Sequence, residues 1–154
     1  MTAILHLNYG KRLLEVFPYG VLSVYHTKNE TTIVVAPSAI YMVLSYLRNN
    51  SSARFEVLID IIGVDYPERK HRFEVVYNLL SIQYNNRLRV KLVTDSLLPI
   101  SSIETIYPAA CWYEREVFDM FGVYFVGNSE GCRRILTDYG FQGHPLRKDF
   151  PVSG

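Results

Sequence analysis

The strongest constraint on the fold is a pair of β-patterned segments separated by two asparagines. From Arg72 to Tyr84 apolar side chains recur at every second position, and Arg87–Val93 alternates leucine and valine with arginine and lysine. Period-two alternation indicates strands with one buried side. Asn85-Asn86 suits a tight turn because asparagine tolerates positive φ. The sequence therefore predicts an antiparallel hairpin whose outward side carries a basic stripe: Arg87, Arg89 and Lys91.

Further elements follow from the same kind of periodicity. Three more segments are rich in the β-branched and aromatic residues that favour strands: Val21–His26, Thr31–Ala36 and Phe55–Val64. The first two are separated by Lys28-Asn29-Glu30, so a second hairpin is expected. Apolar residues at spacings of three and four predict a helix over Ala39–Arg48. A shorter helix is expected over Lys11–Phe17, ended by Pro18.

The second half of the chain carries further helix signals. Ser101 and Glu104 have the spacing of a capping box, which predicts a helix start. A proline inside that helix would restart it, so a second piece is expected over Pro108–Phe121. Gly122 follows directly, and proline near the start with glycine just past the end is the expected asymmetry of a helix.

Composition places these elements in one folded domain. The chain has 154 residues, of which 49% are hydrophobic and 20% charged, so it can bury a core and is not disordered. The net charge of +1 argues against a polyanion-binding protein. No apolar stretch reaches the roughly 20 residues that span a bilayer, and the N-terminus has no features of a secretory or transit peptide. Cys111 and Cys132 cannot form a disulfide framework, so reduced thiols are expected.

The chain changes character near its C-terminal end. Residues 128–154 combine glycines, prolines and charges with spaced apolar side chains, without a helical or strand period. Such a segment cannot fold alone. We expect an extended arm that lies along another surface, either the chain's own body or a partner. The predicted fold is α+β: a compact body over residues 1–127, with a mixed or antiparallel sheet packed by helices, and then the extended C-terminal arm.

A carboxylate-rich helix is the first candidate for chemistry. Glu114, Glu116 and Asp119 lie beside Arg115 in the segment Pro108–Phe121, and paired carboxylates can do acid–base work. Residues at i and i+2 point about 200° apart on a helix, so Glu114 and Glu116 do not share a site. Because Arg115 and Asp119 have i,i+4 spacing, a structural ion-pair cluster is the favoured interpretation.

Other candidate sites carry weaker signals. The four histidines have no metal-ligand spacing, and the chain has no phosphate-binding glycine loop or nucleophile motif. Asp60 is expected to be a hydrogen-bonded acid in a buried strand. Arginine suits fixed contacts with carboxylates. We therefore interpret two basic pairs of the arm as docking residues, each with an acid nearby: Arg133-Arg134 with Asp138, and Arg147-Lys148 with Asp149.

Several blocks of the sequence resemble one known family. Trp112–Gly122 resembles the signature of the 30 kDa subunit of respiratory complex I. In that signature Glu-Arg-Glu is followed by two intervening residues, then an acid, then two apolar residues. Four other blocks also match this family: Ile59–Pro67, Arg72–Tyr84, Arg133–Phe141 and Gly143–Pro151. The resemblance covers Phe55 to Gly154, and the wording of Thr137–Phe141 is similar to mitochondrial members.

The resemblance implies a non-catalytic core subunit of mitochondrial NADH:ubiquinone oxidoreductase, which oxidises NADH, reduces ubiquinone and pumps protons. In that family this subunit lies in the matrix arm at the inner membrane. It packs, with other matrix-arm subunits, against the 49 kDa subunit near the quinone-reduction region. FMN, iron–sulfur clusters and ubiquinone belong to the whole complex, so no cofactor, metal, catalytic residue, nucleic acid or transmembrane segment is expected for this chain.

The resemblance also carries over a set of signature and interface positions. They are Glu114, Arg115, Glu116, Asp119, Arg133, Arg134, Asp138, Tyr139, His144, Arg147, Lys148 and Asp149. Two departures accompany them. The family usually has a His-Pro-acid-Leu loop where this chain has Asn128–Cys132, with Asn128 at the histidine position. Mitochondrial relatives usually continue beyond the position of Gly154, so either the chain is naturally short, which is the expectation here, or the missing piece is supplied by another polypeptide.

Two other classes of function remain as alternatives to a complex I subunit. A free-standing enzyme would use the carboxylates of Glu114, Glu116 and Asp119. An RNA-binding module would use the strand Arg87–Lys91 and would show salt-dependent affinity. The low net charge favours a solvated or partner-facing strand surface over an RNA surface.

Overall fold

The computed structural model describes residues 2–27, 30–131 and 133–152, and its main element is a five-stranded sheet. The strands of this sheet are β1 (Val21–Thr27), β2 (Glu30–Val35), β3 (Val57–Asp65), β4 (Phe73–Ser81) and β5 (Asn86–Thr94). The helices are α1 (Thr2–Val16), the short 3₁₀ helix η1 (Pro37–Ala39), α2 (Ile40–Asn49) and α3 (Ala110–Phe121). Two short strands, β6 (Ile100–Ser101) and β7 (Phe125–Val126), form a separate parallel pair.

The sheet is mixed, with the strand order β1-β2-β5-β4-β3. The pairs β1–β2, β5–β4 and β4–β3 are antiparallel, whereas β2–β5 is parallel. The parallel pair arises because the chain leaves β2, crosses through α2, builds β3 and β4, and only then returns as β5. A mixed sheet packed by helices confirms the predicted α+β class. Both predicted hairpins are also confirmed, although Lys28 and Asn29 of the first turn lie outside the described residues.

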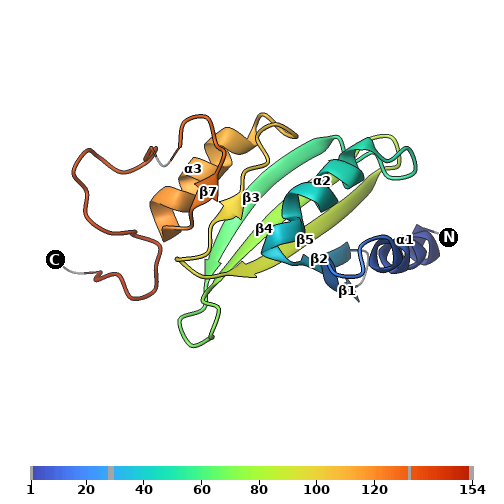
Figure 1. Ribbon diagram of the computed structural model, residues 1–154, viewed down its shortest axis with the longest axis horizontal. Helices are drawn as coiled ribbons and strands as arrows, with labels where there is room; N and C mark the ends of the chain where they lie inside the picture. The colour runs from blue at the N-terminus through green and yellow to red at the C-terminus, as the bar shows by residue number, and fades with distance from the viewer. Residues whose placement is uncertain (1, 28–29, 132, 153–154) are drawn as a thin grey trace.

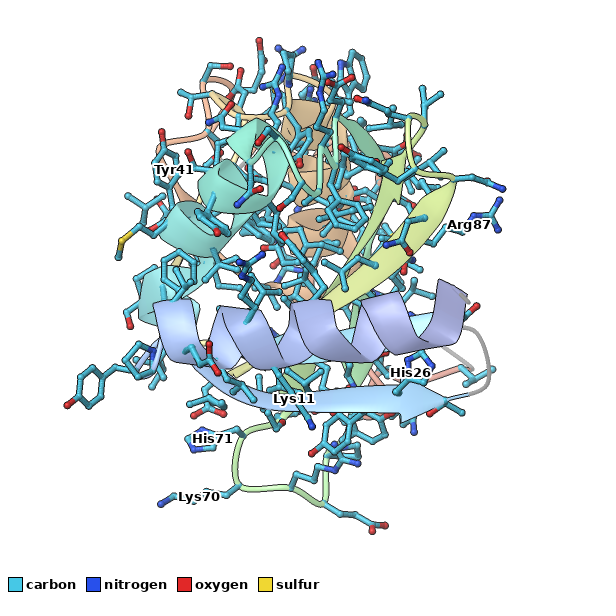
Figure 2. All side chains as sticks on the ribbon, turned by 90° about the vertical axis from the view of Figure 1, so that its right-hand side faces the viewer. Lys11, His26, Tyr41, Lys70, His71 and Arg87 are labelled. Atoms are coloured by element: carbon cyan, nitrogen blue, oxygen red, sulfur yellow. The ribbon has the colours of Figure 1, made fainter. Side chains whose placement is uncertain are left out.

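One face of the sheet is buried against the helices. A row of side chains across four strands is at most 4% exposed: Ile61, Tyr77, Val90 and Ile33. The predicted apolar stripe of α2 belongs to the same core. The opposite face carries no helix among the described residues, and Figure 2 shows Tyr41 of α2 and Arg87 of β5 on opposite sides of the molecule. This arrangement leaves an open sheet face.

The N-terminal helix is longer than predicted. The expected start at Lys11 is wrong, because α1 already begins at Thr2 and runs through Gly10. A Cβ atom on Gly10 would lie 2.6 Å from Cγ1 of Val24. Glycine at position 10 therefore lets α1 approach β1 closely. Because glycine has a low helix propensity, the sequence pattern did not predict a helix through this position.

Two other local predictions need correction. The β4–β5 turn has four residues instead of two, because Ser81 pairs with Asn86. Asn85 alone of the two asparagines has positive φ, at 47°. The capping box is wrong, because Ser101 lies in β6 and Glu104 uses its carboxylate to accept hydrogen bonds from Ser129. Helix α3 begins only at Ala110, and Gly122 ends it with φ 79°, as predicted.

Helix α1 and the C-terminal segment lie at opposite ends of this body. Figure 1 shows α1 at one end of the molecule and α3, with the C-terminal segment wrapped around it, at the other. The described residues of this segment, 128–131 and 133–152, contain neither helix nor strand. None of the helices in the described part of the chain is long and apolar enough to cross a membrane.

The buried face predicts a clear stability difference between two positions of α2. Leu44→Ala removes a fully buried side chain and should lower the free energy of unfolding by about 2–5 kcal/mol. Met42→Ala on the outer side of the helix, where the side chain is 61% exposed, should change it by no more than about 0.5 kcal/mol. Urea unfolding of the two variants measures both, and equal effects would show that α2 does not pack as described.

Candidate functional site

The candidate site residues gather around α3, and Asp119 is the most connected of them. Its side chain is fully buried. Oδ2 accepts hydrogen bonds from the backbone N–H groups of Ile135, Leu136 and Thr137 at 3.2, 2.8 and 2.9 Å. Oδ1 accepts one from the Thr137 hydroxyl at 2.6 Å and pairs with Arg134 at 3.1 Å. One carboxylate of the helix therefore holds a whole turn of the C-terminal segment.

These contacts keep Asp119 ionised. Burial by itself would raise the pKa of the carboxyl, but the hydrogen bonds from Thr137, Leu136 and Ile135 outweigh burial and lower the pKa to about 2. A carboxylate saturated by donors and held charged at neutral pH is neither a proton donor nor a free base. The geometry assigns Asp119 a structural task.

Glu114 holds the other end of the segment. It is 1% exposed and accepts three hydrogen bonds, from the Ser102 hydroxyl at 2.7 Å, the Ile103 N–H at 2.8 Å and the Asn128 amide at 2.8 Å. Burial raises the pKa of Glu114, against the lowering effect of these donors. Asn128 also donates to the carbonyl of Cys111. The residue at the family's histidine position thus has a defined contact, because its amide supplies a donor to the buried acid.

Arg115 differs from the sequence prediction. The expected i,i+4 partner was Asp119, but the guanidinium donates instead to the backbone carbonyls of Arg133 at 3.0 Å and Arg134 at 3.3 Å. Asp119 is occupied by Arg134 and by the segment's own N–H groups, which leaves no place for Arg115. Asp119 does form an ion pair, as predicted, but its partner is Arg134 of the C-terminal segment. The contact therefore joins α3 to the segment, whereas the predicted Arg115–Asp119 pair would have joined two turns of α3.

The last turn of α3 binds the segment a second time, through its free carbonyl groups. The Asp119 carbonyl lies 2.9 Å from Nδ1 of His144 and accepts its hydrogen bond. The Met120 carbonyl accepts from the Leu146 N–H at 3.1 Å, and the Phe121 carbonyl accepts from Arg147 Nε at 2.5 Å. These contacts satisfy carbonyls that a helix C-terminus otherwise leaves without partners.

A third anchor comes from the β3–β4 hairpin. Arg72 binds Asp65 through two hydrogen bonds of 2.6 and 2.7 Å and also pairs with Asp149 at 2.8 Å. Asp65 in turn accepts the backbone N–H of Lys148 at 2.8 Å. The Arg72 guanidinium lowers the pKa of Asp65 and that of Asp149. Sequence-based prediction missed Arg72 and Asp65, because their partners on the segment lie far along the chain.

The remaining candidate residues face outward. Glu116, Asp138 and Tyr139 are exposed, and Tyr139 is exposed completely. Arg133 pairs with Glu130 at 3.3 Å, and the ammonium of Lys148 lies 5.6 Å from the Tyr66 ring centroid. The interpretation of all four basic residues as docking residues therefore needs refinement, since Arg134 and Arg147 bind the chain's own α3.

The carboxylates of α3 do not converge on a common cavity. Glu114 and Asp119 lie in separate networks, with three and five donors respectively, while Glu116 is exposed. Within the described ranges, no three His, Cys, Asp or Glu side chains are placed to hold a metal ion. Asp60 accepts a hydrogen bond from Asn78 at 2.6 Å, as expected, but it is only partly buried.

The C-terminal segment presents a surface of exposed apolar side chains. These side chains project from a backbone that α3 fixes. Five of them are at least 38% exposed: Leu136, Tyr139, Phe141, Leu146 and Val152. Exposed apolar groups on a fixed backbone are typical of a protein–protein interface. The candidate site is accordingly a surface, formed by α3 and the segment that it holds, and it has the composition of an interface.

Known proteins resemble this chain over nearly all of its length. The chain is 54% identical over 144 residues to "NADH dehydrogenase [ubiquinone] iron-sulfur protein 3" of Marchantia polymorpha, covering 94% of this chain and 73% of that protein. It is 49% identical to a probable NADH-ubiquinone oxidoreductase 30.4 kDa subunit of Candida maltosa, covering 96% of this chain and 53% of that protein. The chain thus spans between about half and three quarters of the length of these relatives.

A solved structure shares the fold. One chain of the membrane-bound sulfane sulfur reductase, an archaeal respiratory membrane complex, superimposes with a TM-score of 0.79 at 30% identity, covering 95% of this chain and 85% of that one. The family model for the 30 kDa subunit of respiratory-chain NADH dehydrogenase matches residues 33–154. With most of its length matched by that model and about half of its residues shared with named members, the chain belongs to the family of the 30 kDa subunit of respiratory-chain NADH dehydrogenase.

Proposed function

We propose that this chain is a non-catalytic core subunit of mitochondrial NADH:ubiquinone oxidoreductase, on the matrix side of the inner membrane. In this role it supports electron transfer from NADH to ubiquinone, coupled to proton pumping, without reacting groups of its own. The names of its relatives support the assignment to this complex. The surroundings of the α3 carboxylates support the absence of an active site, because donors hold Asp119 ionised and Glu114 is enclosed with three donors at 1% exposure.

The residues of the chain do not fit an iron–sulfur cluster. Such clusters are held by four cysteine thiolates, whereas the chain has two cysteines. Cys111 is buried, and its sulfur lies 3.7 Å from the Asn128 side-chain oxygen. Although one relative is named an iron-sulfur protein, we propose that FMN, the iron–sulfur clusters and ubiquinone are bound by other subunits of the complex.

We further propose that the C-terminal unit, residues 128–154, packs against the 49 kDa subunit near the quinone-reduction region, while residues 1–127 form the body. The observation that carries this proposal is the set of exposed apolar side chains on a backbone that Asp119 fixes. A pre-ordered backbone loses little conformational entropy on binding, so its exposed anchors contribute to affinity.

The archaeal structure supports an architectural role. Its title names a complex that reduces sulfane sulfur, a different substrate from ubiquinone. A fold shared between complexes with different substrates is best explained by a common task in assembly. The free-standing enzyme remains the alternative, and it would require turnover by the isolated chain.

Truncating one exposed anchor should weaken assembly without affecting the fold. Tyr139→Ala removes a fully exposed side chain, so the stability of the isolated chain should change by no more than about 0.5 kcal/mol. If Tyr139 is a central contact, its loss costs about 2 kcal/mol of binding, or roughly 30-fold in affinity. Quantifying the chain in the NADH-oxidising band of a native gel measures this loss.

Tyr19→Ala is the matched control, because the Tyr19 side chain is 92% exposed and lies between α1 and β1. Equal incorporation of the two variants into the complex would contradict the proposed interface.

The Asp119 contacts predict a pH-dependent stability difference. The pKa of Asp119 is lowered to about 2 in the folded chain, so its stabilising effect is present above the ordinary carboxyl pKa of about 3.9 and is lost as pH falls toward 2. Asp119→Asn should cost about 2 kcal/mol at pH 6, and the difference from the native chain should shrink between about pH 4 and pH 2. Urea unfolding across this range tests it.

A neighbouring aspartate supplies the control for this experiment. Asp138 lies exposed on the same segment, and its side chain makes no hydrogen bond or ion pair with the described residues. Asp138→Asn should leave stability unchanged across the same pH range. A loss equal to that of Asp119→Asn would show that the effect reflects net charge and not the contacts of Asp119.

A further inference from the structure

The open face of the sheet carries a chemical pattern that the C-terminal interface does not explain. Register places Asp60, Asn78 and Arg89 side by side on β3, β4 and β5. Arg89 Nε donates to the Asn78 side-chain oxygen at 3.2 Å, and the Asn78 amide donates to Asp60 at 2.6 Å. This cross-strand chain of hydrogen bonds holds Arg89 in a fixed position on the face.

The basic stripe of β5 is almost neutralised by acids from the adjacent strands. Arg89 pairs with Glu30 of β2 at 3.2 Å, and Lys91 pairs with Glu74 of β4 at 2.8 Å. Arg87 is different, because it is exposed and has neither a hydrogen bond nor an ion pair from its side chain to any described residue. The stripe therefore offers one uncompensated cation, which is too little for a polyanion such as RNA.

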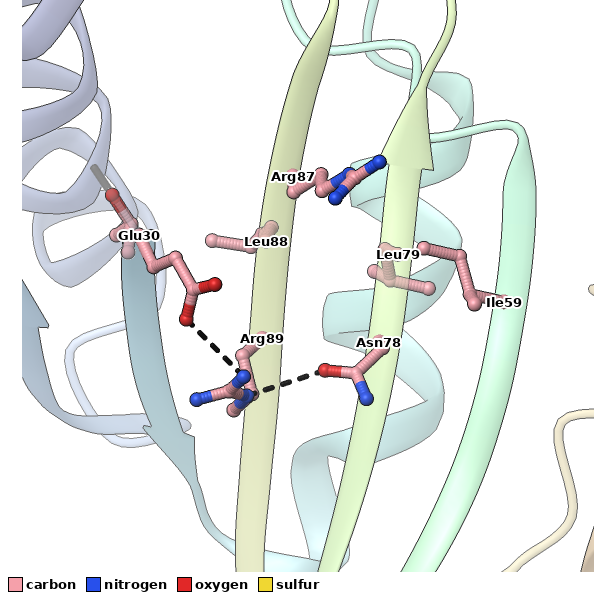
Figure 3. Close-up of a pocket in the computed structure, with 8 residues that line it drawn as sticks. Glu30, Ile59, Asn78, Leu79, Arg87, Leu88 and Arg89 are labelled. Atoms are coloured by element: carbon pink, nitrogen blue, oxygen red, sulfur yellow. Dashed lines mark hydrogen bonds and ion pairs between the residues drawn. The ribbon is translucent and has the colours of Figure 1, made fainter.

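Arg87 stands beside a hollow in this face. The hollow has a volume of about 170 Å³ and is lined by Arg87, Arg89, Asn78, Glu30 and Ile59, among others. Figure 3 shows the Arg87 side chain reaching across β5 toward β4, while Arg89 is held between Glu30 and Asn78. The unpaired guanidinium and the fixed one thus line the same hollow, next to an apolar side chain.

We propose that this hollow, which we call the open-face hollow, receives a carboxylate from an acidic segment of a neighbouring subunit. Arg87 supplies the charge partner, and the guanidinium fork suits the two oxygens of a carboxylate. This inference rests on the proposed function, since it requires that the chain be part of a multisubunit complex. It adds a second contact surface, on another side of the body from α3.

The surroundings favour a peptide over a free anion. Ile59 and Ile62 on the same face are 39% and 44% exposed, so an acidic side chain flanked by apolar residues can bury them while it pairs with Arg87. A free anion would gain only one solvent-exposed ion pair, which contributes little. An apolar surface containing arginine is the usual composition of an interface core.

Charge reversal in the assembled complex tests the proposal. Arg87→Glu places like charges opposite each other, so the chain should dissociate from the complex about tenfold faster than the native chain. Lys11→Glu, an equal charge change at an exposed residue of α1, is the control and should have no effect. Because the Arg87 side chain has no partner in the described structure, thermal unfolding of the isolated full chain should be the same for Arg87→Glu and the native chain.

A photo-crosslinker at position 59 identifies the occupant of the open-face hollow. It should capture a segment that contains aspartate or glutamate, and reversing that acid to lysine should restore the slow dissociation of Arg87→Glu. Crosslinking to a segment without an acid, failure of this rescue, or native-like dissociation of Arg87→Glu would each overturn the proposal. Salt-sensitive binding of an RNA oligonucleotide that Arg87→Glu abolishes would also overturn it, in favour of a nucleic-acid surface. Absence of the native chain from the complex would instead contradict the proposed function.

Discussion

The carboxylate of Asp119 is the interaction on which the C-terminal part of this chain depends. A segment without helix or strand has no internal ladder of hydrogen bonds, so its backbone groups must find partners elsewhere. Asp119 supplies them for three consecutive N–H groups, from a position that the helix fixes and the core buries. Removing this acid would leave donors of the segment and the Arg134 guanidinium without their acceptor.

The other contacts extend the same principle along the segment. Glu114 binds its beginning through Asn128, and the last carbonyls of α3 bind it near His144 and Arg147. The chain must turn sharply after α3, and Gly122 permits this with a φ of 79°. A Cβ atom there would also collide with the Arg147 guanidinium, so the glycine leaves room for this contact. The buried acids of the charged helix signature, Glu114 and Asp119, are therefore engaged in structural contacts with the segment.

Sequence patterns predicted what local physics controls. The pairing of β4 with β5, the alternation of β5, the apolar stripe of α2 and the glycine after α3 all depend on neighbouring residues, and all four are present. The partners of Arg115 and Arg72 could not be predicted, because they are set by which segments meet after folding. The predicted capping box is absent for the same reason: it depends on a contact between distant segments. The Glu104 carboxylate accepts a hydrogen bond from the hydroxyl of Ser129, which lies 25 residues further along the chain.

We propose that the chain acts by docking, and that it docks through the surface held by α3. Crosslinking mass spectrometry of the purified NADH-oxidising complex tests this most directly, with a lysine-reactive reagent. Lys148 is exposed on the fixed segment, so docking through this surface predicts crosslinks from Lys148 to the 49 kDa subunit. A complex that oxidises NADH without this chain, or a Lys148 that crosslinks only within the chain, would contradict it.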